Sequence, residues 1–204
     1  MKILNLYAGI GGNRKLWGDA HEITAVEYKP KIAQIYQDFF PKDKVIVADA
    51  HEYLLKHFEE FDFIWSSPPC QTHSRVRFVA MRTRGGKIRQ KPIYPDMKLY
   101  QEILLLQNYT RKTKFVVENV IGFYKPLIEP QEISKHYFWA NFFINSYDCK
   151  DRGHMESIEN LEARKGFDLK GKKIAKRLVL RNCVEPELGL HVFQEAFREY
   201  KTLF

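Results

Sequence analysis

Residues 2–12 read KILNLYAGIGG, a short apolar run followed at once by glycines. The run over residues 2–7 has the length and composition of a buried strand. Glycines after a strand let the backbone turn sharply, and N–H groups exposed at such a turn can approach a ligand. The segment therefore predicts a first strand and a ligand-binding turn, although a plain strand–helix connection would show the same pattern.

Strand-like and helix-like segments alternate after this opening. The expected strands are residues 2–7, 23–27, 45–47, 61–65 and 114–118. The expected helices are residues 13–17, 30–39, 50–58, 96–109, 156–164 and 186–201. This rhythm predicts an α/β fold, in which helices cover both faces of an open, mostly parallel, Rossmann-like sheet.

Composition sets the broad class. The chain has 204 residues, of which 45% are hydrophobic, so it can form a domain with a real core. Its net charge of +8 suits a polyanionic partner. The three cysteines have no metal-ligand spacing, which argues against a disulfide framework and favours a cytoplasmic protein. We expect no metal and no membrane association, and we expect a monomer.

Acidic side chains follow the second and third expected strands. Ligands of open α/β sheets bind beyond the carboxyl ends of the strands. Glu27, with Tyr28 beside it, could accept ribose hydroxyls, and Asp49 could bind an adenine amino group. Each acid could equally cap a helix or be solvated. Together with the glycine turn, they favour an adenosine-type cofactor.

The fourth strand leads into Ser66-Ser67-Pro68-Pro69-Cys70-Gln71. A lone cysteine is usually a small buried hydrophobe. Cys70, however, follows a strand end and two prolines and precedes a basic loop, and positive surroundings favour the reactive thiolate. Glu118 ends the fifth strand on the same rim. This pair suggests covalent catalysis combined with protonation of a ring nitrogen.

In order along the chain, these motifs resemble those of the cytosine-C5 DNA methyltransferase family. The matching elements are residues 7–12, Glu27-Tyr28, Asp49, Pro69-Cys70-Gln71, Glu118-Asn119-Val120, the strand 135–141 (KHYFWAN) and residues 181–184. The resemblance implies a class I S-adenosylmethionine-dependent methyltransferase acting on double-stranded DNA. The residues that it places at S-adenosylmethionine are Tyr7, Ala8, Gly9, Gly11, Gly12, Glu27, Tyr28, Asp49, Ala50, Pro69, Asn182 and Val184.

The resemblance also implies a mechanism. The Cys70 thiolate attacks C6 of a flipped-out cytosine, and Glu118 shares a proton with N3. Many family members carry an arginine pair before the strand 135–141, where this chain has Ser134 and His136. His136 or Lys135 could replace the missing arginine, so the expected catalytic set is Cys70, Glu118 and His136.

The basic loop after the nucleophile is the expected DNA-contacting segment, although it could be merely a solvated charged loop. The residues expected to contact nucleic acid are Gln71, Ser74, Arg75, Arg77, Arg82, Arg84, Lys87 and Arg89. Residues 165–177, with six basic side chains, could form a second contact face. We expect a catalytic domain over 1–144, a minimal target-recognition segment over 145–176 and a C-terminal segment over 177–204 that folds back.

Three alternatives remain open at this point. A branch of the same family methylates tRNA, and its nucleophile loop also begins Pro-Pro-Cys-Gln. Ser67-Pro68-Pro69 resembles the start of an amino-methyltransferase site, although Cys70 and Glu118 count against that activity. The missing arginine pair is also compatible with a catalytically silent nucleic-acid-binding module.

Overall fold

A computed structural model describes residues 1–75, 91–148 and 156–199. In it, seven strands form a single sheet in the order β3-β2-β1-β4-β5-β7-β6. The strands are β1 (Lys2–Leu6), β2 (Glu22–Glu27), β3 (Lys44–Val47), β4 (Phe63–Ser66), β5 (Lys114–Val120), β6 (Gln131–Ile133) and β7 (His136–Ala140). Strands β1 to β5 pair in parallel, whereas β7 runs antiparallel to both β5 and β6. The predicted α/β class and mostly parallel sheet are confirmed.

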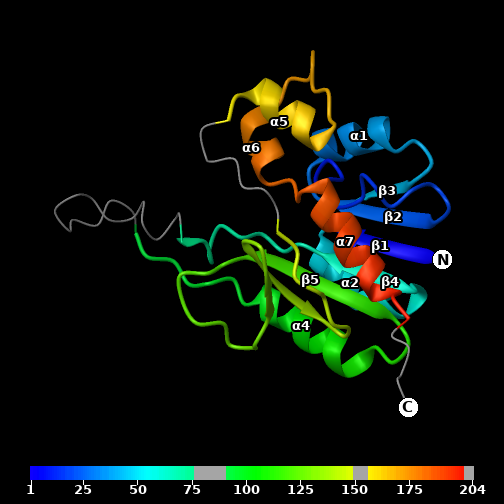
Figure 1. The fold of residues 1–204 in the computed structure, drawn as a ribbon, viewed down its shortest axis with the longest axis vertical. Coiled ribbons are helices and arrows are strands. Elements are labelled where there is room, and N and C mark those ends of the chain that lie inside the picture. Colours follow the sequence, from blue (N-terminus) through cyan, green and yellow to red (C-terminus); the bar gives the residue numbers. More distant parts are fainter. Residues whose placement is uncertain (76–90, 149–155, 200–204) are drawn as a thin grey trace.

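Helices cover both faces of this sheet (Figure 1). They are α1 (Pro30–Phe39), α2 (Ala50–His57), α4 (Lys98–Tyr109), α5 (Ile158–Lys165), α6 (Lys176–Arg181) and α7 (Pro186–Ala196), with a 3-10 turn at Phe58–Glu60. On one face, α2 and α4 pack on Leu4, Ile64 and Val117. On the other face, α7 packs on Ile3 and Phe63, and α1, α5 and α6 share a core cluster with Ala25 of β2.

Local signals in the sequence explain where several helices begin and end. Pro30 occupies the first turn of α1, where its missing N–H costs nothing. The side chain of Asp49 accepts the N–H groups of His51 and Glu52 and so caps α2. Ser157 caps α5 in the same way, and Gly166 ends that helix in the left-handed conformation.

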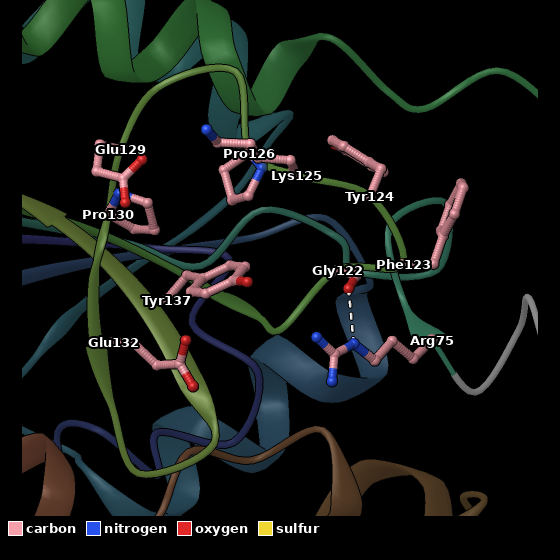
Figure 2. Close-up of a pocket in the computed structure, with 10 residues that line it drawn as sticks. All are labelled: Arg75, Gly122, Phe123, Tyr124, Lys125, Pro126, Glu129, Pro130, Glu132 and Tyr137. Atoms are coloured by element: carbon pink, nitrogen blue, oxygen red, sulfur yellow. Dashed lines mark hydrogen bonds between the residues drawn. The ribbon is translucent and has the colours of Figure 1, made fainter.

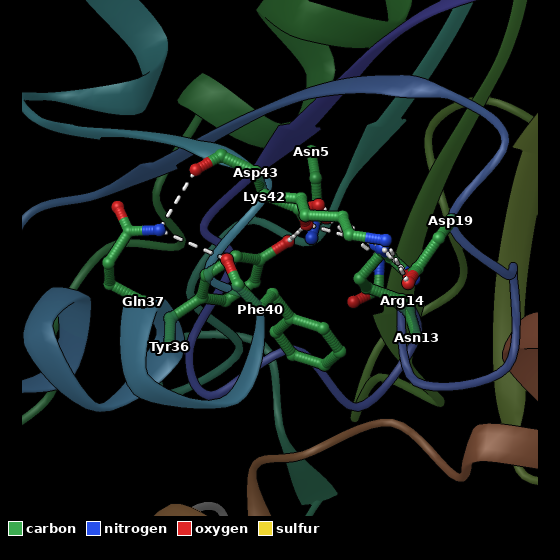
Figure 3. A network of polar contacts seen from close by, with 9 residues as sticks. All are labelled: Asn5, Asn13, Arg14, Asp19, Tyr36, Gln37, Phe40, Lys42 and Asp43. Carbon is green, nitrogen blue, oxygen red and sulfur yellow. Dashed lines mark hydrogen bonds and ion pairs between the residues drawn. The ribbon is translucent and has the colours of Figure 1, made fainter.

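The prediction of a helix over residues 13–17 is wrong, because these residues form successive turns. Side-chain hydrogen bonds to neighbouring elements take the place of a helical ladder, as Figure 3 shows. The Asn13 amide donates to Asn5 Oδ1 of β1 at 2.8 Å. Arg14, fully buried, donates to Asp43 at 2.9 Å, and Tyr36 of α1 donates to the same carboxylate at 2.8 Å.

The C-terminal helix packs closely against this turn region. The Trp17 indole donates to the Gly189 carbonyl at 3.1 Å and stacks on Phe193, with ring centroids 5.1 Å apart. Helix α7 ends at Ala196, so the helix expected over residues 186–201 was too long. The chain after β1 is thereby held between β1, α1 and α7.

Candidate active site and cofactor cleft

A cleft of about 880 Å³ lies at the carboxyl ends of the parallel strands. The residues expected at the cofactor that line it are Tyr7, Ala8, Gly9, Gly12, Glu27, Tyr28, Asp49, Ala50, Pro69, Asn182 and Val184. Gly11 does not line it. A Cβ atom at Gly11 would lie 2.3 Å from the Phe40 ring, so its small size serves packing against α1.

The glycine turn presents one open side and one packed side. Gly9 has a φ of 55°, and a Cβ atom there would meet nothing within 4 Å. At Gly12, by contrast, a Cβ atom would lie 2.2 Å from Cys183 Sγ and 2.4 Å from the Val184 carbonyl oxygen. The segment at Cys183 and Val184 therefore packs directly against the glycine turn, on the side opposite Gly9.

Two carboxylates border the cleft near this turn. Glu27 accepts the Gly9 N–H at 3.0 Å and the Lys29 N–H at 2.9 Å, which leaves acceptor capacity unused. Asp49 both caps α2 and lines the cleft. Burial alone would raise the pKa of Asp49, but hydrogen bonds from the Glu52 and His51 N–H groups and the nearby Lys98 ammonium lower it below its ordinary value.

The segment between β4 and Cys70 is fixed by side chains on both sides. The Trp65 indole donates to Ser67 Oγ at 2.8 Å, and the Asn119 amide donates to the Pro68 carbonyl at 2.9 Å. The Cys70 carbonyl then accepts two N–H groups from the following turn, at 3.0 Å each. Asn119 thus holds the segment that leads to Cys70, a role that its motif alone did not reveal.

The expectation that positive surroundings favour the Cys70 thiolate rests on the basic loop after it and stays a prediction, while the described residues act in the opposite direction. Burial raises the pKa of the Cys70 thiol, and the negative charge of Glu118 raises it further. Much of the basic loop after Cys70 lies outside the described residues. Within the described structure, the thiol is therefore the favoured form in the absence of substrate.

Glu118 and His136 meet across the antiparallel pair of β5 and β7. His136 Nδ1 lies 2.6 Å from Glu118 Oε1, and the carboxylate is buried. Cys70, Glu118 and His136 all line the same cleft. The structure therefore brings together the three residues expected to be catalytic.

The described residues expected to contact nucleic acid lie at the rim of the cleft. Gln71 and Ser74 line the cleft itself. Arg75 lines a neighbouring cavity of about 430 Å³, where its Nε donates to the Gly122 carbonyl at 2.9 Å (Figure 2). Arg77, Arg82, Arg84, Lys87 and Arg89 lie outside the described residues.

The expected recognition segment packs partly into the core. Leu161, Phe167 and Leu169 are buried in one cluster with α1, and α5 lies beside α1 in Figure 1. Lys165 is only 3% exposed, and its ammonium lies 2.8 Å from Glu185 Oε1. Lys165 is therefore not available to the expected basic face over 165–177.

Glu102 is a buried acid that is not among the site residues predicted from the sequence. It lies on α4 and accepts hydrogen bonds from Tyr7 and Ser66. A signal was present, because Leu99, Ile103 and Leu106 mark the apolar face of this helix and Glu102 falls on it. A charged residue on such a face needs buried partners.

Among the described residues, no cluster of three or more histidine, cysteine or acidic side chains could hold a metal ion. The helices within the same ranges are all too short or too polar to span a lipid bilayer.

The strand order, with five parallel strands followed by an antiparallel β7, and the glycine turn with acids at the strand ends define a Rossmann-like methyltransferase fold. Residues 1–130 match the family model of the C-5 cytosine-specific DNA methylases. The chain belongs to this family.

The individual relatives that match this chain share only low sequence identity with it and align over part of their length. The chain is 26% identical over 117 residues to the tRNA (cytosine(38)-C(5))-methyltransferase of Rattus norvegicus, an alignment that covers 53% of this chain and 30% of that protein. A solved structure of a Spodoptera frugiperda DNMT2 mutant aligns with 26% identity and a TM-score of 0.41, over 60% of this chain and 36% of that one. The Entamoeba histolytica methyltransferase EhMeth aligns with 14% identity and a TM-score of 0.37, over 59% and 38%. The chain thus spans about a third of the length of these relatives.

Proposed function

We propose that this protein transfers a methyl group from S-adenosylmethionine to C5 of cytosine in double-stranded DNA, with Cys70 as the nucleophile. The observation that carries the proposal is that Cys70, Glu118 and His136 open into the same cleft as the glycine turn and Glu27. A covalent nucleophile and an acid for the base thus face the place where a nucleoside cofactor would bind.

The residues around the turn fit S-adenosylmethionine. The open side of Gly9 gives room for close approach, and Glu27 keeps acceptor capacity for ribose hydroxyls. Tyr28 lines the cleft while 72% exposed, so its ring is free to pack on a purine. Asp49 borders the same space. When bound, the cofactor supplies an electrophilic methyl group.

Cys70 and Glu118 would then activate the cytosine. Cytosine C5 is a poor nucleophile, so the Cys70 thiolate first forms a bond to C6, which makes C5 enamine-like. Glu118 donates a proton to N3 and neutralises the charge that develops on the ring. C5 then takes the methyl group, and S-adenosylhomocysteine is released. Loss of the C5 proton to water, cleavage of the sulfur–C6 bond and return of the N3 proton to Glu118 restore the aromatic ring.

The electrostatics suggest that acid and nucleophile are activated together. The charge on Glu118 raises the pKa of Cys70. Protonation of Glu118, which is the form that N3 requires, removes that charge and favours the thiolate. His136, 2.6 Å from Glu118, would hold the carboxyl group in place as the proton moves.

Access to C6 requires the cytosine to leave the duplex stack, which costs a few kcal/mol. Phosphate contacts from a basic surface can offset that cost. We propose that Gln71, Ser74, Arg75 and the basic residues after them contact the DNA. We propose that the exposed part of residues 145–176 reads the target sequence.

The test is transfer of labelled methyl groups from S-adenosylmethionine to mixed-sequence duplex DNA. The expected product is 5-methylcytosine, and Cys70→Ser should abolish it. Glu60→Gln is the control, because Glu60 is exposed and does not line the cleft, and it should leave transfer intact. Equal transfer by the wild type and Cys70→Ser would refute the proposed mechanism.

A second candidate substrate is tRNA, favoured by the names of the curated relatives that match this chain. Unmodified tRNA belongs in the same assay as a parallel arm. Label in tRNA, with none in duplex DNA, would replace the DNA substrate by RNA while retaining the roles of Cys70 and Glu118.

A further inference from the structure

Glu102 occupies an unusual place for an acid. Its side chain is 0% exposed, and it projects from the apolar face of α4, among Leu99, Ile103 and Leu106. A buried carboxylate is costly unless several donors satisfy it. Such donors are present, and they come from three different elements.

The first donor belongs to the cofactor turn. The Tyr7 hydroxyl donates to Glu102 Oε1 at 2.5 Å. Tyr7 has a φ of 53°, a left-handed conformation that costs a non-glycine residue about 1–3 kcal/mol and persists only where the surroundings hold it. The hydrogen bond to Glu102 fixes the Tyr7 hydroxyl and so helps to hold the Tyr7 backbone in this conformation.

The other donors belong to the nucleophile strand and to α2. The Ser66 hydroxyl, at the end of β4, donates to Glu102 Oε2 at 2.6 Å. His51 Nδ1, in the first turn of α2 beside Asp49, lies 3.0 Å from Glu102 Oε1. The hydrogen bond to Glu102 raises the pKa of His51 and so favours its charged form beside the carboxylate. Tyr7, Asp49 and the segment after Ser66 all line the cleft, whereas Glu102 itself is not among its described lining residues.

We infer that Glu102 is a positioning residue that fixes the cofactor turn at Tyr7 relative to the nucleophile strand at Ser66. This inference rests on the proposed function, because it concerns the placement of bound S-adenosylmethionine relative to Cys70. Glu102 acts through Tyr7, Ser66 and His51 rather than by touching the cofactor.

The test is a double-mutant cycle read by equilibrium binding of S-adenosylmethionine. Tyr7→Phe keeps the ring and removes the hydroxyl, and Glu102→Gln keeps the shape and removes the charge. Each should weaken binding by about tenfold, the scale of one hydrogen bond to a charged group. In the Glu102→Gln background, Tyr7→Phe should change the affinity less than about twofold, because its partner is already altered.

A second readout needs no cofactor. Hydrogen–deuterium exchange of the unliganded protein should accelerate in Glu102→Gln, both in the peptide over residues 7–12 and in the peptide over residues 66–72. Glu60→Gln is the matched control, because Glu60 accepts from His57 Nδ1 at 2.6 Å in an exposed pair near the other end of α2. This control should leave binding and exchange unchanged.

The outcomes separate the two proposals. A wild-type protein that does not bind S-adenosylmethionine would contradict the proposed function. A wild type that binds and transfers methyl groups, with independent effects of Tyr7→Phe and Glu102→Gln, would overturn the positioning role alone. Lower melting temperatures with unchanged affinity would likewise reduce Glu102 to a purely structural residue.

Discussion

At the scale of single residues, Cys70 and Glu118 are electrostatically linked. Burial and the Glu118 charge hold the pKa of Cys70 above its ordinary value. The rate of Cys70 alkylation should therefore rise with pH and reach half its maximum at a higher pH than that of an unperturbed cysteine. Glu118→Gln removes the charge, so the midpoint should move to lower pH. Iodoacetamide labelling, followed by mass spectrometry across a pH series, measures both midpoints, and an unchanged midpoint in the variant would contradict the link.

His136 offers a second test at this scale. It lies 2.6 Å from the buried Glu118, in a position where many family members carry an arginine. His136→Ala should lower the methyl-transfer rate roughly 10- to 100-fold, the cost of a lost hydrogen bond to a charged group. The affinity for S-adenosylmethionine should be unchanged in His136→Ala, because His136 lies on the side of the cleft proposed to bind cytosine. His136→Arg should restore part of the rate, and loss of cofactor affinity in either variant would argue for a different role.

At the scale of elements, α7 locks the turn that follows β1. A Cβ atom at Gly189 would lie 2.5 Å from the Asn13 carbonyl oxygen and 2.6 Å from its Cα, both backbone atoms that cannot rotate away. Alanine normally stabilises a helix interior by about 1 kcal/mol relative to glycine. Gly189→Ala should instead destabilise the protein by about 1–3 kcal/mol through overpacking.

Urea denaturation measures this change in the free energy of unfolding. Gln194→Ala, at an exposed position of the same helix, is the matched control and should be nearly neutral. A stabilising effect of Gly189→Ala would show that α7 does not pack against Asn13 as described.

The helices and turns also show which parts of the fold can be predicted from local sequence patterns. Helix α1 matches its expected bounds because Pro30 and four buried apolar residues mark it locally. The failure at residues 13–17 has a non-local cause, since Asn5, Asp43 and Gly189 supply its hydrogen bonds and contacts from other elements. The same holds at the site. Cys70 and Glu118 are visible as strand-end residues, whereas the link from Glu102 to Tyr7 joins residues 95 positions apart.

At the scale of the whole molecule, the net charge of +8 predicts that affinity for the proposed DNA substrate falls steeply as salt rises. Arg75, exposed at the rim of the cleft, should contribute one phosphate contact. Arg75→Gln should therefore reduce the slope of log affinity against log salt by roughly one. Arg111→Gln is the control, because Arg111 is exposed and precedes β5, at the amino ends of the parallel strands rather than at the carboxyl ends where the cleft lies. Equal effects of the two substitutions would indicate non-specific charge attraction.

In the proposed reaction, Cys70 forms a bond to C6 of cytosine at this cleft. The most direct test is a duplex containing 5-fluorocytosine, incubated with the protein and S-adenosylmethionine. Fluorine cannot leave C5 as a proton does, so the sulfur–C6 bond cannot be cleaved after methyl transfer. We predict a covalent protein–DNA species that survives denaturation, carries the methyl group and maps by mass spectrometry to Cys70. A protein that methylates the unsubstituted duplex but forms no such adduct, or forms it at another residue, would contradict the account.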